Sequence, residues 1–199
     1  MELEELAKAV LGRVFVELEA SGRHVHVTTE QARCLFGHDL TPRRELSQPG
    51  QYLAKERVVV VGPRGKFENV AVLGPARKAA QVEISLTDAR TLGLNPPVRL
   101  SGDTANTPGC TLTGPCGSVS LNEGVIVAKR HIHLHPRDAE RFHVTDKQVV
   151  RLQTFTMRPA VFEDVTVRIS PDFATAVHLD YDEANACGFA DGDRGRILP

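Results

Sequence analysis

The sequence predicts a mainly β fold, a barrel or a sandwich, built by internal duplication. Runs of four to ten apolar or alternating residues follow one another closely, separated by turns that contain Gly and Pro. Such spacing favours barrels and sandwiches over a doubly wound sheet. The segment "SGRHVHVTTEQARCLFG" (21–37) also matches "AKRHIHLHPRDAERFHV" (128–144): both read Arg-His-aliphatic-His-aliphatic and then start a helix. The chain therefore contains two related halves.

The strands can be assigned from these runs in chain order. They are "RVVVVGPRG", "NVAVLGP", "QVEIS", "PVRLSG", "CTLTGPCG", "SVSL", "GVIVAKRHIHL", "QVVRLQTF", "DVTVRIS", "TAVHLD" and "GRIL". The stretch "GPRGK" (62–66) lacks the full pattern of a phosphate-binding loop and a following helix, so we interpret it as a hairpin turn. At the start of the chain, apolar residues at steps of three and four predict an amphipathic helix over 1–20. That helix would pack on the body of the protein or dock onto a larger assembly.

Composition and charge exclude several classes of partner. The 24 Lys and Arg residues balance 25 Asp and Glu residues, whereas nucleic acids and anionic membranes select a strong basic excess. No apolar run approaches the roughly 20 residues of a membrane span, and the acidic start lacks the features of a secretory signal. The four cysteines have no spacing typical of a disulfide framework. We therefore expect a cytoplasmic protein with no nucleic-acid or membrane partner.

Four segments share one sequence pattern, which we call the repeated grammar: a strand ends on a potential metal ligand, and a capping residue then opens a short helix. The ligand positions are His26, Glu83, His133 and His178, and the cap positions are Thr28, Ser85, His135 and Asp180. Capping boxes are expected at three of these caps, with Gln31, Asp88 and Glu183 as the partners. His135 precedes Pro136, a residue tolerated at the first helical position. We therefore expect His135 to be a helix cap rather than a metal ligand.

Each half offers three nitrogen or oxygen ligands. These are His24, His26 and Glu83 in the first half and His131, His133 and His178 in the second. Three such ligands with an open fourth position are the composition of a catalytic zinc site, and six from two halves indicate two metal ions facing each other. One His-x-His pair is often only a polar strand edge, but its repetition favours a metal site. A cupin site, which would use Glu30, is rejected because Glu30 falls inside an expected helix and the second cupin motif is missing.

At these residues the sequence resembles the PduL-type phosphotransacylases, known as phosphate propanoyltransferases. The matching pieces are "SGRHVHV", "LSQPGQY", "VLGPARKAAQVEIS" and "GVIVAKRHIHL", in order along nearly the whole chain. The resemblance implies two β-barrel domains with short capping helices and an active site between them. With the duplication, it gives an N-terminal helix (1–20), a first barrel repeat (21–123) and a second (124–199), with strands exchanged between the barrels.

The resemblance also implies ligands and roles for individual residues. Two zinc ions fall on the six positions named above, coenzyme A (CoA) and phosphate are the substrates, and a phosphate-binding, catalytic arginine falls on Arg77. Ser21 and Leu73 fall near the CoA end. The alternative for Arg77 is a surface ion pair. Four further cations would meet the CoA phosphates or form a solvated face: Arg43, Arg44, Arg64 and Lys66.

The implied reaction converts a short-chain acyl-CoA (propanoyl-CoA or acetyl-CoA) and phosphate into acyl phosphate and CoA. Because the cysteines show no partner base, we expect direct, metal-assisted attack of phosphate on the thioester. We further expect a homo-oligomer, with a dimer favoured, and an association with or near a bacterial microcompartment. Two alternatives remain open. They are a dimetal hydrolase of thioesters or phosphoesters, and a non-catalytic β-barrel binding protein.

Overall fold

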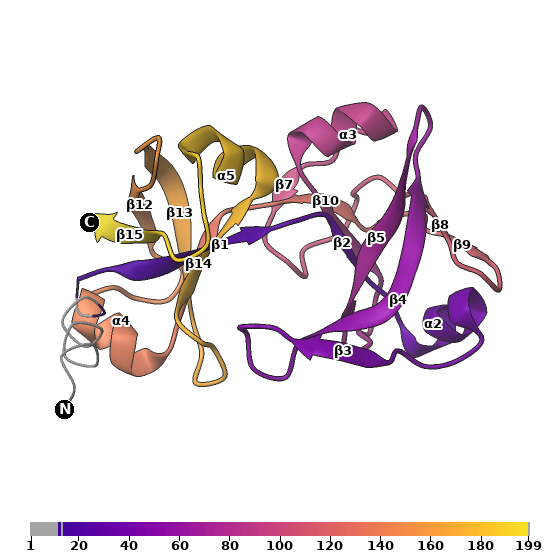
Figure 1. Cartoon of the computed structure of the whole chain (residues 1–199), viewed down its shortest axis with the longest axis horizontal. Coiled ribbons are helices and arrows are strands. Elements are labelled where there is room, and N and C mark those ends of the chain that lie inside the picture. Colours follow the sequence, from indigo (N-terminus) through magenta and orange to yellow (C-terminus); the bar gives the residue numbers. More distant parts are fainter. Residues whose placement is uncertain (1–11, 13, 199) are drawn as a thin grey trace. The chain divides into compact units, whose positions relative to one another are not determined.

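The computed structural model describes residue 12 and residues 14–198, which form two units (Figure 1). One unit holds Gly22–Ala128, and the other joins the described residues up to Ser21 with those from Lys129 onward. The mainly β fold with short capping helices is confirmed, since the described helices have eight residues or fewer. None of the described helices is long and apolar enough to cross a membrane.

The Gly22–Ala128 unit is an open nine-stranded sheet with two helices. The strand order is β7-β10-β6-β2-β5-β4-β8-β9, and β3 pairs with β4 beside this path. The "GPRG" stretch forms the hairpin turn between β4 and β5, as predicted. The elements are β2 (His24–His26), α2 (Thr29–Phe36), β3 (Pro42–Glu45), β4 (Tyr52–Val61), β5 (Lys66–Gly74), β6 (Gln81–Ile84), α3 (Leu86–Leu92), β7 (Val98–Arg99), β8 (Thr111–Thr113), β9 (Ser118–Ser120) and β10 (Val125–Ala128).

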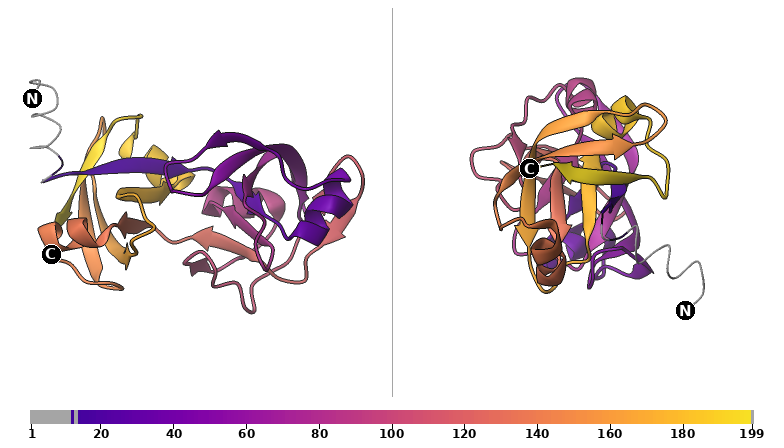
Figure 2. Two further views of the ribbon diagram at one scale, coloured as in Figure 1. Left: turned by 90° about the horizontal axis from the view of Figure 1, so that it is seen from below. Right: turned by 90° about the vertical axis from the view of Figure 1, so that its left-hand side faces the viewer.

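The second unit is a closed barrel of six strands in the order β1-β14-β11-β13-β12-β15. Strand β1 closes it, parallel to β14 and antiparallel to β15, so the indigo strand lies beside yellow and orange ones in Figures 1 and 2. The elements are β1 (Val16–Ser21), β11 (His131–Leu134), α4 (Pro136–Phe142), β12 (Val149–Phe155), β13 (Val161–Ile169), β14 (Ala176–Asp180), α5 (Tyr181–Cys187) and β15 (Arg194–Leu198).

The predicted N-terminal helix is wrong for its last turn. Val16 and Leu18 are buried with Glu17 exposed between them, the alternation of a strand, and Val16–Ser21 form β1. The remainder of the predicted helix lies largely outside the described residues. The two units divide after Ser21 and after Ala128, close to the predicted repeat boundaries. β1 precedes the first His pair but belongs to the barrel, and β10 precedes the second His pair but belongs to the open sheet.

The helix caps follow the predicted grammar. Thr28, Ser85 and Asp180 each accept the backbone N–H three residues on, and each forms a full capping box. His135 accepts the N–H of Arg137 and Pro136 opens α4, so His135 is confirmed as a cap. These caps end each ligand-bearing strand at a defined residue and thereby fix which side chains the strand presents.

Each unit has its own core, and the core strands hold the histidines in place. Val25 of β2 lies opposite Val72 and Val82, and Ile132 of β11 lies opposite Val167 and Val177. All six side chains are fully buried. Because side chains alternate along a strand, the residues on either side of Val25 and Ile132 project from the opposite face.

Candidate metal centres

The first ligand group consists of His24, His26 and Glu83, which β2 and β6 bring together. The two strands are antiparallel with His24 opposite Glu83, and His26 shares a face with His24. The candidate ligand atoms of the three side chains lie within 4.8 Å of one another, and all three residues are buried. Residues up to 59 positions apart in sequence thus converge on one point, as the repeat predicts.

Burial and charge act differently on the three side chains of this group. His24 Nε2 and His26 Nε2 lie 3.6 and 3.8 Å from Glu83 Oε1. Burial lowers the pKa of His26 to about 2, with His24 and Arg77 adding to the effect, so this imidazole is neutral. Burial opposes ionisation of Glu83, but His24 and His26 hold its pKa below the usual range.

His24 is oriented by the backbone. Its Nδ1 donates to the Gly22 carbonyl at 2.8 Å, which leaves Nε2 directed toward Glu83. Burial opposes a charge on His24, yet Glu83 holds the pKa of His24 above its ordinary value. Glu83 thus favours the protonated form of His24, and a cation binding between the two side chains would compete with that proton.

A polar network supports the first group and reaches Arg77. Gln81 donates from Nε2 to Glu83 Oε1 at 2.5 Å and to Ser101 Oγ at 2.9 Å. Arg77 donates from Nη1 to the same Ser101 oxygen at 3.1 Å. The positive charge of Arg77 acts to lower the pKa of both His24 and His26, although Glu83 keeps that of His24 above its ordinary value. Sequence reasoning missed Gln81 and Ser101, although Gln81 stands two residues before Glu83 on the same strand face.

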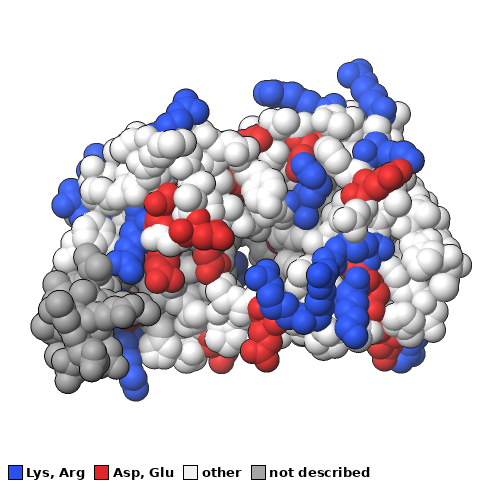
Figure 3. Space-filling view, viewed as in Figure 1, with Lys and Arg blue, Asp and Glu red and all other residues white. Residues whose placement is uncertain are grey.

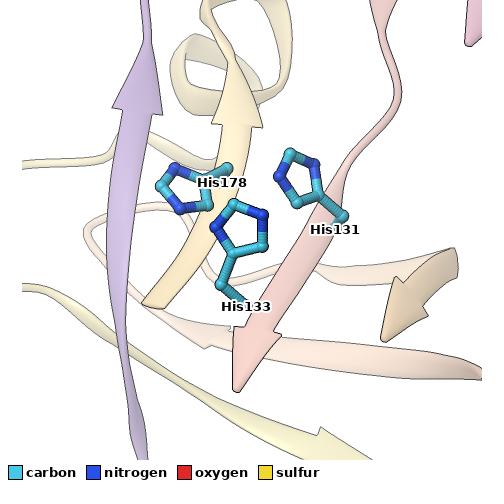
Figure 4. Close-up of side chains that lie close together, drawn as sticks. All are labelled: His131, His133 and His178. Carbon is cyan, nitrogen blue, oxygen red and sulfur yellow. The ribbon is translucent and has the colours of Figure 1, made fainter. Parts of the chain in front are cut away.

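The second ligand group consists of His131, His133 and His178, whose rings turn toward one another from β11 and β14 (Figure 4). His131 lies opposite His178 in the antiparallel pairing of these strands, the equivalent of His24 opposite Glu83. The ring centroids of His178 lie 5.0 Å from His131 and 4.8 Å from His133. His131 and His133 are buried, and His178 is half-buried.

The surroundings of the second group are aromatic as well as polar. His131 Nδ1 donates to the Lys129 carbonyl at 2.8 Å, which repeats the His24–Gly22 contact. The Phe173 ring stacks on His133 with centroids 4.0 Å apart. The Arg168 guanidinium lies 5.6 Å from the centre of Phe173. Phe173 and Arg168 carried no sequence signal because neither belongs to the repeated grammar.

Both groups fit a zinc ion by the chemistry of their donors. Each offers three nitrogen or oxygen atoms in a small volume, the set that a catalytic zinc site uses. The carbonyl contacts to His24 and His131 fix the tautomer that leaves Nε2 as the donor.

Comparison with known proteins identifies the family. The family model described as phosphate propanoyltransferase matches residues 17–190. The chain belongs to the phosphate propanoyltransferase family. The phosphate propanoyltransferases of Listeria monocytogenes and Enterococcus faecalis are each 54% identical to it, over 98% and 92% of this chain and 93% and 87% of their own lengths. The phosphate propanoyltransferase of Thermotoga maritima is 53% identical over 87% of this chain and 84% of its own.

The other residues singled out from the sequence lie around these groups without a ligand to test them. Ser21 ends β1 and Leu73 lies in β5, so their role in CoA binding by this phosphate propanoyltransferase family member stays a prediction. Glu30 is exposed in the first turn of α2, which agrees with the rejection of a cupin site. Figure 3 shows Lys and Arg side chains gathered over β3 and β4, where Arg43 and Arg44 are exposed.

Proposed function

We propose that this phosphate acyltransferase exchanges a short acyl group, propanoyl or acetyl, between CoA and phosphate by direct attack of phosphate on the thioester. Membership of the phosphate propanoyltransferase family over residues 17–190 is the observation that carries the proposal. The two ligand groups support the metal-assisted part, because they place six donors where the duplicated strands end. The expected location of the active site between the two barrels stays a prediction.

In this mechanism phosphate binds beside the first ligand group. Zinc ions held by the two groups would neutralise phosphate charge, polarise the thioester carbonyl and accept the departing sulfur. Arg77 offers a planar pair of N–H donors that matches phosphate oxygens, and its bond to Ser101 fixes the guanidinium beside the group. Gln81 donates both to Glu83 and to the same Ser101 hydroxyl, so one hydrogen-bond network orients Arg77 and Glu83 together.

The chemistry balances without a covalent enzyme intermediate. A phosphate oxygen forms a bond to the thioester carbonyl carbon, the carbon–sulfur bond breaks, and the CoA thiolate leaves and takes a proton. A cysteine nucleophile would have to ionise near neutral pH. Burial raises the pKa of the Cys110 thiol to about 12 and also raises that of Cys187. Direct transfer therefore fits these thiols better than an acyl-cysteine.

A thiol-release assay tests the proposal. Propanoyl-CoA and acetyl-CoA are supplied with and without phosphate, to enzyme as purified, after chelation, and after zinc is returned. We expect phosphate-dependent release of CoA that disappears on chelation and returns with zinc. Release that does not depend on phosphate would instead identify a thioester hydrolase. Activity that survives complete metal removal would refute the metal-assisted mechanism.

Assembly and location belong to the same proposal and have separate tests. A homodimer predicts twice the mass of the chain in size-exclusion chromatography with light scattering. If the enzyme is cytoplasmic and lies in or near a bacterial microcompartment, the full chain fused to a reporter should co-purify with compartment shells.

A further inference from the structure

The third ligands of the two groups have different neighbours on the adjoining parallel strand. β14 pairs with β1 and places Glu19 opposite His178. In the other unit β6 pairs with β10 and places Ile126 opposite Glu83. One group therefore has a carboxylate ligand beside an aliphatic side chain, and the other has an imidazole ligand beside a carboxylate. Each group thus has one acidic residue in this pair of facing positions. In the first group the acid is the ligand Glu83 itself, and in the second it is Glu19 on the adjoining strand.

Glu19 forms an ion pair with the His178 ring through the Nδ1 atom of that ring. Glu19 Oε2 lies 3.5 Å from His178 Nδ1, with side-chain exposures of 32% and 14%. Figure 4 shows β1 (indigo) next to the strand that carries His178. At His24 and His131 the Nδ1 atoms donate hydrogen bonds to backbone carbonyl oxygens at 2.8 Å. At His178 the group that faces Nδ1 is a carboxylate, in a longer ion-pair contact.

We propose that Glu19 is the positioning residue of the second ligand group. It accepts the Nδ1 proton of His178, fixes the tautomer and ring orientation, and leaves Nε2 as the donor to a metal. A carboxylate at this place also raises the basicity of the imidazole. Glu19 thereby gives a group of three neutral histidines the negative charge that Glu83 gives directly to the first group. The inference rests on the metal-binding part of the proposed function.

The test measures zinc affinity in the full chain. Glu19→Gln keeps the shape of the side chain and removes its charge, and Glu19→Asp keeps the charge with a shorter reach. Glu17→Gln is the matched control, because Glu17 lies two residues earlier on β1, is exposed, and pairs with Arg194 on β15. Zinc per chain is measured by mass spectrometry of metals over a series of chelator-buffered free zinc concentrations.

We expect two ions per wild-type chain, and a roughly 10- to 100-fold weaker affinity for one of them in Glu19→Gln. Glu19→Asp should recover part of the loss and Glu17→Gln should bind as the wild type does. With cobalt in place of zinc, Glu19→Gln should change the visible absorption of one ion only, which a general loss of stability would not do.

Two results would overturn the inference. One is a Glu19→Gln variant whose affinities match those of the wild type and of Glu17→Gln. The other is an equal loss of affinity for both ions. Thermal unfolding of the metal-free variants would then show whether a damaged fold causes that loss. Failure of the proposed function would appear differently, as a wild-type chain that binds no zinc at any buffered concentration.

Discussion

The open sheet and the closed barrel hold their ligand groups on the same arrangement of three strands. β2 lies between β5 and β6, as β11 lies between β13 and β14, and the third ligand faces the first histidine in both. Beyond these positions the groups diverge. Gln81, Ser101 and Arg77 form a polar, cationic border to the first group, whereas Phe173 borders the second. The positions of the ligands are thus the same in both halves, whereas the side chains around them differ in polarity and charge.

The same comparison extends to an arginine that precedes each His pair. Arg23 forms two bonds to Asp88 at 2.7 and 3.1 Å and lies 4.2 Å over the Phe67 ring. Arg130 forms one bond of 2.6 Å to Glu183 and lies 5.7 Å from Phe162. In both halves the acidic partner is the third residue of a capping box. The arginine therefore ties a ligand-bearing strand to the helix that ends the neighbouring one.

The largest effects should come from removing one histidine in either half. His26→Ala and His133→Ala each delete a donor, and we expect each to lower kcat by at least about 10³-fold, the equivalent of several kcal/mol of lost charge stabilisation. Zinc analysis should show one ion lost and one kept in each variant. If one variant kept near-normal activity, the two groups would not both serve the reaction.

Exchanging the third ligands sharpens the comparison. Glu83→His and His178→Glu each give one half the donor set of the other. We expect both variants to bind zinc but to lose roughly 10- to 100-fold in kcat, because ligand charge tunes what a bound metal does. Kinetics with matched zinc loading measures this. Full activity in both would mean that the difference in third ligand has no catalytic meaning.

Phosphate use should depend on the first half alone. Arg77→Ala removes a charge-assisted pair of bonds and should raise the KM for phosphate about 10- to 100-fold, with a smaller change in the KM for acyl-CoA. Arg168→Ala is the matched variant from the barrel and should leave the KM for phosphate nearly unchanged. Equal effects of the two substitutions would contradict the assignment of phosphate to Arg77.

The two arginine ties should differ in strength. Arg23→Ala leaves the Asp88 side chain, 6% exposed, without its paired cation, and we expect a loss of about 2 kcal/mol in the free energy of unfolding. Arg130→Ala should cost about 1 kcal/mol, because Glu183 is more exposed than Asp88 and accepts a single bond from the arginine. Urea unfolding of the zinc-free chains measures both. A larger loss for Arg130→Ala would reverse the order that the geometry gives.

A smaller effect is expected at the helix cap that differs between halves. Burial raises the pKa of Asp180 to about 6, where Ser85 has an uncharged hydroxyl. The folded state therefore holds this proton more tightly than the unfolded state, and stability falls as pH rises from about 4 to about 6. Asp180→Ser keeps a cap and removes the titration, so it should gain on the order of 1 kcal/mol over the wild type above pH 6 and nothing below pH 4. A gain that does not vary with pH would contradict this origin.

Much of the architecture is readable from the repeated grammar. The sequence places the ligand positions and the helix caps because both lie at strand ends, where a one-residue change would turn a side chain to the wrong face. The segment Val16–Ser21 is predicted as helix because Leu18 continues the spacing of three and four that begins at Leu3. Its place in the barrel is set by pairing with β14 and β15, whose partner residues lie 159 to 179 positions away in the sequence, so no local pattern encodes it.

The contacts around the ligand groups were harder to foresee. Ser101 reaches Gln81 and Arg77 from a loop with no motif of its own. Phe173 sits before β14 in a segment whose counterpart in the first half reads differently. These side chains meet the groups through tertiary packing, so only coordinates reveal them.

Strand β1 also sets the order in which the molecule can be completed. As the chain leaves the ribosome, every strand of the Gly22–Ala128 sheet emerges before any barrel strand other than β1. β1 must then wait with unpaired edges until β14 and β15 are synthesised, a period in which such edges invite wrong pairing. The second ligand group is therefore completed only once β14 has been made, after every strand that carries the first group.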